Sequence, residues 1–388
     1  MVFWNIKKDW IKKVLDRYKL LRDIESLSDK LFLDFSGEKM IAHQVWDIIA
    51  KDPTFPYKVK SISTDWIVPS WQGNLKDLSE VKKRLDRYTV LSVDGSQIYP
   101  DRHQGTACHL INIGTVQLNY GISRRSEKNV FLNSEPHVFV DFDQELKESP
   151  TELVNCQRQE LELKACCQLV DTLKNGVDPT VLLFDGSLIF WHLESKSIEV
   201  KQLFLSRYLA ALQQLCSQDV LLAGYISLPK SKELLNLIRV YLCDFVVPGC
   251  EKYKAVNHIV DAQIAKFYLK PFTRTIIFKN HSTITKYYPS ALHPHFFYMD
   301  VGNEIVRIEI PAWVASDQKK IEIISQVIAD QAVKGMGYPI ALAEAHEQAV
   351  VKGPDREFFY QLINKISIEQ GRVSPLSQKV RKKMGMGI

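Results

Sequence analysis

The stretch TVLSVDGS, residues 89–96, decides the fold, and it has a counterpart in TVLLFDGS, residues 180–187. Each stretch begins with β-branched and aliphatic residues and ends on Asp-Gly-Ser. A short, continuous apolar run is typical of a strand buried on both faces. An aspartate at the carboxyl end of such a strand lies where α/β sheets bind their ligands. We therefore predict that Asp94 and Asp185 lie at one edge of a common sheet.

The segments around these strands predict an α/β fold. Strand-like segments (106–121 and 137–143) follow the first motif, and a helix is expected over 151–174. After the second motif the pattern predicts a helix over 201–217, a strand over 220–227 and another helix over 230–242. Later segments predict a hairpin that turns at Gly302-Asn303 and helices over 317–334 and 339–352. This order favours a mixed sheet flanked by helices.

The N-terminal region and the rest of the chain differ in sequence pattern. Residues 1–87 are interpreted as a helical N-terminal region followed by an extended linker, in which Pro53, Pro56 and Pro69 disfavour a helix. Apolar residues at helical spacing include Trp10, Val14, Tyr18 and Leu21. Residues 88–388 are expected to form one α/β domain, with a less regular insertion at about 245–294. The basic tail after residue 376 is expected to be solvated.

Composition excludes several classes of protein. The 388 residues contain 50 Lys and Arg against 45 Asp and Glu, a net charge of +5 that permits nucleic-acid binding without requiring it. No apolar run approaches the roughly 20 residues that span a bilayer, and the N-terminus lacks the core of a secretory signal. We therefore expect a cytoplasmic protein that does not enter a membrane. The seven cysteines contain no Cys-x-x-Cys pair and are expected to be free buried thiols.

Two further side chains are candidates to join the aspartates. In the helix over 151–174, the apolar stripe through Cys166 and Leu169 extends back to Glu162 rather than Glu160. Glu162 is therefore expected to face the sheet, and Glu160 to face solvent. His346 lies on a late helix with small residues on one face, where it could bind a cation, move a proton or simply pack in the core.

The order Asp94, Glu162, Asp185, His346 is that of ribonuclease H-like nucleases. Carboxylates brought together repel one another unless a cation lies between them. Hard carboxylate oxygens suit ions such as Mn2+ or Mg2+, and a pair of such ions about 3.5–4 Å apart hydrolyses phosphodiesters. The sequence therefore predicts a metal-dependent nuclease. A haloacid dehalogenase-type phosphatase is disfavoured because Ser96 and Ser187 occupy the place of its second acid.

Between Val90 and Val351 the chain resembles the NurA family of DNA end-processing nucleases. The resemblance rests on these segments: VDGSQIYPDRH, RQELELKA, VLLFDGSLI, GYISLPKSKELL, FFYMDVGNEIVRIEIPAWVA and GYPIALAEAHEQAV. It implies a ribonuclease H-like fold and Mn2+-dependent cleavage of single-stranded DNA and of 5′ ends. It also implies a homodimer and a partnership with the HerA hexameric translocase. By matched motif, Asp94, Glu162, Asp185 and His346 would be the catalytic and metal-binding set.

Other residues in the matched segments are candidates to bind DNA. Lys230 and Lys232 precede a helix whose free N–H groups could join them in binding phosphates, and Arg307 could do the same. Tyr338 could border the site. Two alternatives remain open at this point: a ribonuclease H-like module that has lost catalysis and only binds nucleic acid or a partner, and RNA rather than DNA as the substrate.

Overall fold

The computed structural model describes residues 15–28, 34–81, 85–100, 108–121, 129–140, 148–173 and 178–371. Its strands are β1 (Ser70–Trp71), β2 (Leu78–Glu80), β3 (Tyr88–Ile98), β4 (Cys108–Tyr120), β5 (Val130–Val140), β6 (Thr180–Asp185), β7 (Leu221–Ile226), β8 (Thr273–Thr275), β9 (Phe278–Lys279), β10 (Pro294–Asp300) and β11 (Ile305–Pro311). Within the described residues these 11 strands form one sheet, with the main order β1-β9-β10-β11-β7-β6-β3-β4-β5. β8 pairs with β10 and with β2.

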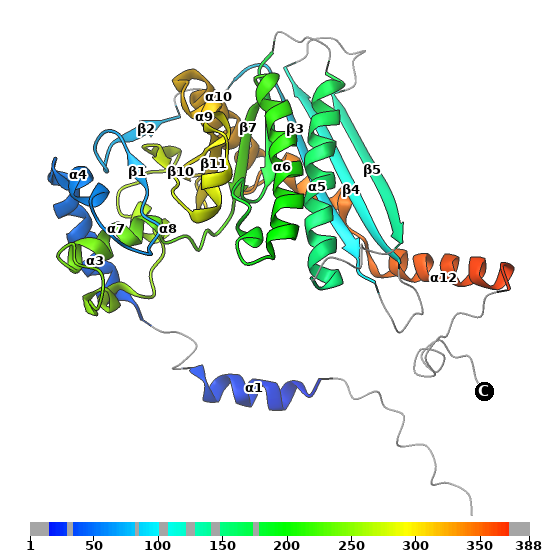
Figure 1. Cartoon of the computed structure of the whole chain (residues 1–388), viewed down its shortest axis with the longest axis horizontal. Helices are drawn as coiled ribbons and strands as arrows, with labels where there is room; N and C mark the ends of the chain where they lie inside the picture. Colours follow the sequence, from blue (N-terminus) through cyan, green and yellow to red (C-terminus); the bar gives the residue numbers. More distant parts are fainter. Residues whose placement is uncertain are drawn as a thin grey trace, which may run out of the picture.

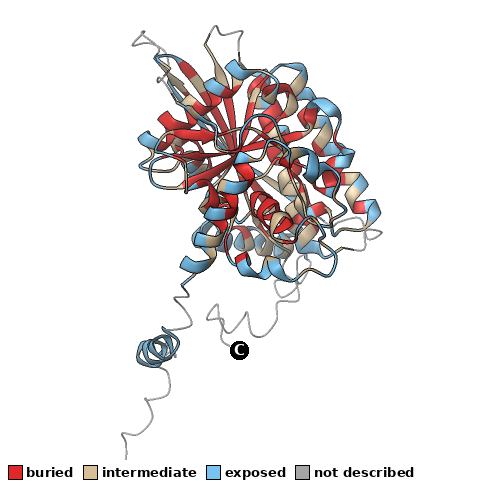
Figure 2. Cartoon of the chain, turned by 90° about the vertical axis from the view of Figure 1, so that its left-hand side faces the viewer, coloured by how far each residue is buried: buried red, intermediate tan, exposed pale blue. Residues whose placement is uncertain are grey.

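The helices surround this sheet. The α-helices are α1 (Arg17–Ser26), α3 (Ser36–Lys51), α4 (Phe55–Lys60), α5 (Pro150–Asp171), α6 (Ile198–Ser217), α7 (Glu233–Leu242), α8 (Asp261–Ala265), α9 (Ala312–Ala315), α10 (Gln318–Lys334), α11 (Ile340–Ala349) and α12 (Gly353–Glu369). The 3-10 helices are η2 (Trp191–Leu193), η3 (Lys252–Val256), η4 (Thr283–Tyr287) and η5 (Ser290–Leu292). Figure 1 shows α5 and α6 side by side in front of the strands. Figure 2 shows most of the strands as the buried interior of the molecule, whereas the edge strand β5 is largely exposed.

Five strands form the part of the sheet that the two Asp-Gly-Ser motifs predict. β3, β4 and β5 are successive antiparallel neighbours, whereas β6 pairs parallel to β3 and β7 pairs parallel to β6. The resulting order β5-β4-β3-β6-β7, with β4 reversed, is the ribonuclease H-like mixed sheet, and the predicted fold class is confirmed. Because β3 and β6 are parallel, their carboxyl ends lie at the same edge of the sheet.

The remaining strands extend the sheet beyond β7. β11 pairs antiparallel with β7, and β10 and β11 form the predicted hairpin with Gly302 at a φ of +102°. A positive φ is readily adopted by glycine. β10 also contributes Phe296 and Tyr298 to a second apolar cluster, which includes Trp46 of α3 and Leu234 of α7. This cluster joins the helices near the N-terminus to the far end of the sheet. The boundary at residue 87 stays a prediction.

Four features differ from the sequence expectations or fall outside them. A short helix, α4, lies in the predicted extended linker with Pro56 in its first turn, where proline is tolerated because that N–H has no partner in the helix. α12 was not predicted, and among its described residues only Phe359 is buried. Cys243 and Cys250 form a disulfide, which corrects the expectation that all cysteines are free thiols. Trp10, Val14 and the basic tail lie outside the described residues. None of the helices in the described ranges combines the length and apolar character needed to cross a bilayer.

Candidate active site at the carboxyl edge of the parallel strands

Asp94 meets His346 because α11 lies directly on the sheet. Asp94 on β3 is paired across the strands with Gly114 on β4. A Cβ at Gly114 would come within 2.5 Å of the carbonyl oxygen of Ala345 and of the amide nitrogen of Ala349, so only glycine allows α11 to approach this closely. With α11 this close to the sheet, His346 Nδ1 lies 2.9 Å from Asp94 Oδ2. The other oxygen, Oδ1, accepts the N–H of Gly95 at 2.8 Å.

The serine of the first motif anchors the end of α11. Ser96 Oγ donates to the carbonyl of Ala349 at 2.6 Å and accepts the N–H of Val351 at 3.0 Å. Asn112 Nδ2 donates to the same Ala349 carbonyl at 2.8 Å. These bonds satisfy backbone groups that the helix end leaves without partners. Ser96 and Asn112 therefore fix the helix that presents His346.

Asp185 stands at the carboxyl end of β6, where Tyr338 reaches it. Tyr338 Oη donates to Asp185 Oδ2 at 3.0 Å, and its ring meets the buried ring of Tyr225 edge-on with centroids 5.5 Å apart. The surrounding protein desolvates the Asp185 carboxyl and raises its pKa, although the residue is still accessible at the strand end. The negative charge of Asp94 raises this pKa further, and the hydrogen bond from Tyr338 opposes the rise.

Glu162 approaches the same edge from α5. The prediction that it faces the sheet is confirmed, because a Cβ at Gly95 would come within 2.7 Å of Glu162 Oε1. The carboxylate is buried and accepts a hydrogen bond from Arg158 Nη1 at 2.8 Å. The same Arg158 nitrogen donates to the carbonyl of Gly95 at 2.9 Å. Gly95 is thus required in the first Asp-Gly-Ser motif by the close approach of α5.

The three carboxyl groups influence one another electrostatically. Burial raises the pKa of Glu162 to about 8, and the charges of Asp94 and Asp185 add to the rise while Arg158 opposes it. His346 in turn lowers the pKa of Asp185. Such mutual repulsion is relieved when a cation binds between the carboxylates.

The donor set fits a divalent cation. Three carboxylates and one imidazole suit ions such as Mn2+. Each carboxylate now has its own partner: His346 for Asp94, Arg158 for Glu162 and Tyr338 for Asp185. Within the described ranges, no three His, Cys, Asp or Glu side chains are already gathered around one metal position.

Glu309 holds the second Asp-Gly-Ser turn, a role that sequence reasoning missed. Its Oε2 accepts the hydroxyl of Ser187 at 2.7 Å and the N–H of Leu188 at 2.8 Å. Its Oε1 accepts Arg307 Nε at 2.8 Å. Glu309 is 1% exposed, so the turn just after Asp185 is tied to a buried charge pair on β11. An acidic residue within the apolar strand IVRIEIP was the only signal in the sequence.

Arg307 does not lie where a phosphate could reach it. Its side chain is buried, pairs with Glu233 at 2.9 Å and with Glu309 at 2.8 Å, and stacks over the ring of Phe296 at 3.8 Å from the centroid. The expectation that Arg307 contacts DNA is therefore corrected. β11 is covered on both faces, so its charged side chains, Arg307 and Glu309, pair with each other and with Glu233 instead of meeting solvent.

Glu160 is also buried, against the expectation that it faces solvent. Its carboxylate pairs with Lys164 at 2.5 Å and with Arg207 of α6 at 2.9 Å. The helical periodicity of α5 correctly predicted that Glu162 faces the sheet. Glu160 lies on the neighbouring face of the helix, which α6 covers. Glu160 therefore belongs to an ion-pair network between α5 and α6.

Lys230 and Lys232 follow β7 at the same sheet edge as Asp185, because β6 and β7 are parallel. Lys230 is exposed in the connection to α7. Lys232 Nζ donates to the carbonyl of Asn257 at 3.0 Å, which engages its ammonium group locally. Of the two, Lys230 is the freer to meet a phosphate.

Comparison with known proteins identifies one family model and several solved structures with low sequence identity. A family model described as the NurA domain matches residues 88–351 of the 388. A crystal structure of NurA is 11% identical with a TM-score of 0.39 and covers 91% of this chain and 98% of its own. A structure of NurA with manganese is 10% identical with a TM-score of 0.41 and covers 90% of this chain and 98% of its own.

A structure of NurA bound to dAMP and manganese is 12% identical with a TM-score of 0.36, and it covers 90% of this chain and 98% of its own. No curated protein matches the chain significantly. The family assignment therefore rests on the sequence match over residues 88–351.

Proposed function

Since the chain belongs to the NurA family, we propose that it is a divalent-metal-dependent nuclease that hydrolyses DNA phosphodiesters. Asp94, Glu162, Asp185 and His346 are its metal-binding and catalytic residues. The observation that supports this most directly is that three carboxyl groups and an imidazole, from two strands and two helices, lie near one edge of the sheet, where the carboxyl groups raise one another's pKa and His346 contacts Asp94.

In this proposal each residue of the site has a distinct role. The carboxylates and His346 would hold Mn2+, or Mg2+ in its place, as a pair of ions that activate water and stabilise the leaving 3′-oxygen. Glu162 must ionise to act as a ligand, and Arg158 stabilises the ionised form while fixing its direction. Tyr338 orients the Asp185 carboxylate, and Glu309 holds the turn that follows it.

For the substrate, we propose single-stranded DNA and DNA ends, cut by endonuclease and 5′ to 3′ exonuclease activity. The exposed Lys230 at the same edge supports an anionic substrate there. In the cell we propose a cytoplasmic homodimer that works with a HerA-type hexameric ATPase in end resection during double-strand break repair. These partners and this context follow from the family resemblance rather than from the contacts described above.

A cleavage assay on a labelled single strand tests the proposal against the alternative of an inactive binding module. We expect cleavage with Mn2+, none with EDTA, and none by Asp94→Asn or Asp185→Asn. Asp171→Asn is the matched control, because the hydrogen bonds that Asp171 on α5 accepts in the described part of the chain come from Gln214 and Gln218, outside the site. Calorimetry should show that the two site variants lose Mn2+ affinity. A folded wild type without metal-dependent cleavage would favour the module.

A further inference from the structure

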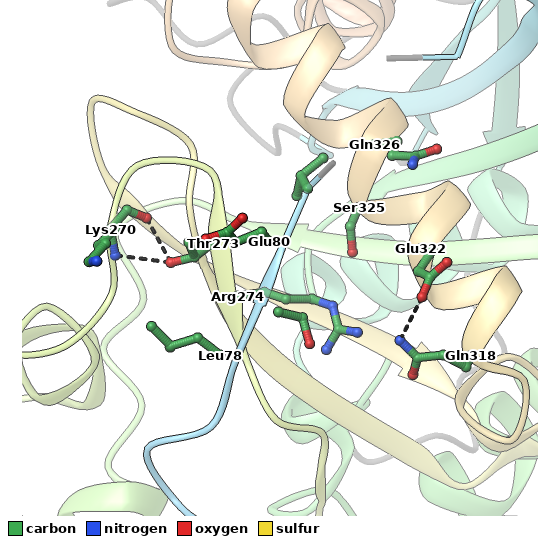
Figure 3. Close-up of a pocket in the computed structure, with 11 residues that line it drawn as sticks. Leu78, Glu80, Lys270, Thr273, Arg274, Gln318, Glu322, Ser325 and Gln326 are labelled. Atoms are coloured by element: carbon green, nitrogen blue, oxygen red, sulfur yellow. Dashed lines mark hydrogen bonds between the residues drawn. The ribbon is translucent and has the colours of Figure 1, made fainter. Parts of the chain in front are cut away.

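A second polar site lies away from the carboxylates. A cavity of about 400 Å3 opens between the β2/β8 pair and the first half of α10. Figure 3 shows Arg274 reaching from β8 toward Gln318, Glu322 and Ser325 of α10. Arg274 is only 3% exposed, whereas Glu322 is exposed, so the arginine forms the inner end of the cavity.

Arg274 has few partners for a buried cation. Its Nη1 donates to the carbonyl of Thr275 at 3.1 Å, and its guanidinium lies 5.5 Å from the centroid of the Phe297 ring. No carboxylate in the described part of the chain forms an ion pair with it; the charge of Glu322 at the rim acts only through space and partly offsets the fall that burial causes in the pKa of Arg274. A guanidinium carries five N–H donors and stays protonated in proteins. Donors that line the cavity therefore remain available to an anion.

Arg307 on β11 shows how a structural arginine is paired elsewhere in the same sheet. Arg307, which is as deeply buried, is held by two carboxylates, Glu233 and Glu309, at 2.9 and 2.8 Å. A buried charge is costly unless it is paired. At Arg274 the place of the carboxylate is left to an open cavity, which is the arrangement expected when an external anion supplies the counter-charge.

The rim limits what can bind. It carries both signs of charge, with Lys270 opposed by Glu80 and Glu322, and Gln326 adds an amide. The two glutamates would repel a polyanion such as a DNA backbone. We propose that this cavity binds a small molecule with one anionic group, a phosphate monoester or a carboxylate, through Arg274.

This site is separate from the nuclease centre. The first half of α10 lies beside the amino end of β7, since Lys320 of α10 pairs with Asp219, and Trp313 Nε1 of the preceding helix α9 donates to the carbonyl of Val220 at 2.9 Å. Asp185 lies at the opposite, carboxyl edge of the parallel strands. The proposal therefore does not depend on nuclease activity.

Calorimetric titration of the full chain in EDTA, with inorganic phosphate and acetate as probes, tests whether the cavity binds an anion. We expect saturable binding of at least one probe, weakened tenfold or more by Arg274→Met and unchanged by Arg356→Met on the exposed face of α12. Phosphate binding without acetate binding assigns a phosphate monoester, and the reverse assigns a carboxylate. Gln326→Glu, which leaves Arg274 in place, should weaken binding by repulsion.

Stability provides a second readout. Without a probe, Arg274→Met should melt at or above the wild-type temperature, because it removes a buried charge that lacks a counter-ion. A wild type that binds neither probe saturably overturns the proposal, as does binding that survives Arg274→Met. A lower melting temperature for the probe-free variant would make Arg274 a structural residue and would also overturn it.

Discussion

Replacing Glu162 by glutamine should abolish cleavage and at the same time stabilise the metal-free protein at alkaline pH. Glu160→Gln, two residues away on the same helix, is the matched control. Both glutamates are buried, but Glu160 is neutralised by Lys164 and Arg207, whereas Glu162 has one cationic partner, Arg158, and two carboxylate neighbours. The two variants should therefore move stability in opposite directions.

The magnitude follows from the pKa of Glu162, which rises from 4.5 to about 8 in the folded protein. Because the folded state binds this proton more tightly than the unfolded state, the stabilisation is complete below pH 4.5. It is then lost as the pH rises through about 8. A shift of that size corresponds to about 5 kcal/mol at 1.36 kcal/mol per pKa unit. Glutamine stays neutral, so Glu162→Gln should escape this loss.

Denaturant unfolding in EDTA at pH 5 and pH 9 measures the effect. The free energy of unfolding of Glu162→Gln, relative to wild type, should rise between the two pH values by up to about 4 kcal/mol, the part of the effect that lies above pH 5. Glu160→Gln should lower stability by about 1–3 kcal/mol at both pH values, because it leaves two cations without their carboxylate, and should keep Mn2+-dependent cleavage. If Glu162→Gln follows the wild-type pH profile or still cleaves DNA, the assignment of Glu162 is wrong.

Two further changes test the surroundings of the site, and a third tests Asp261, a buried carboxyl on α8 that accepts hydrogen bonds from Leu235 and Tyr298. Gly114→Ala would place a Cβ 2.5 Å from the Ala345 carbonyl, so it should cost about 1–3 kcal/mol and displace α11, measured by denaturation and cleavage; unchanged values would contradict the close approach. Glu309→Gln cannot accept all three of its hydrogen bonds, and we expect at least a tenfold loss of cleavage, checked by initial rates at matched folded fraction; full activity would remove its role in holding the turn. Burial and the charge of Glu233 raise the pKa of Asp261, so the stability that its proton contributes is lost as the pH rises above the ordinary carboxyl range. Asp261→Asn should therefore gain stability over wild type with rising pH in unfolding experiments, and parallel profiles would refute this.

The sequence predicted the elements that local patterns specify. Two apolar runs that end on Asp-Gly-Ser became the parallel strands β3 and β6, and their aspartates lie at one edge. The apolar stripe of α5 correctly turned Glu162 toward the sheet. These predictions succeed because side-chain periodicity decides which face of a strand or helix is apolar, and apolar faces are buried.

Which element covers the other face of a helix or strand depends on the tertiary structure. Glu160 is buried because α6 lies against α5, and Arg307 is buried because β11 is covered on both sides. The spacing of Cys243 and Cys250 likewise gave no sign that the turn between them would bring their sulfurs together.

By itself, then, the sequence determined the longer strands (β3 to β7, β10 and β11), the facing side of α5 and the identity of Asp94, Glu162, Asp185 and His346 as candidates, whereas it gave no sign of the short strands β1, β2, β8 and β9. Only the tertiary structure decided that Arg158, Tyr338 and Glu309 hold these groups, and that Arg274 faces a cavity. The physical reason is that periodicity acts over a few residues, whereas these partners come from elements brought together by long-range strand pairing and helix packing.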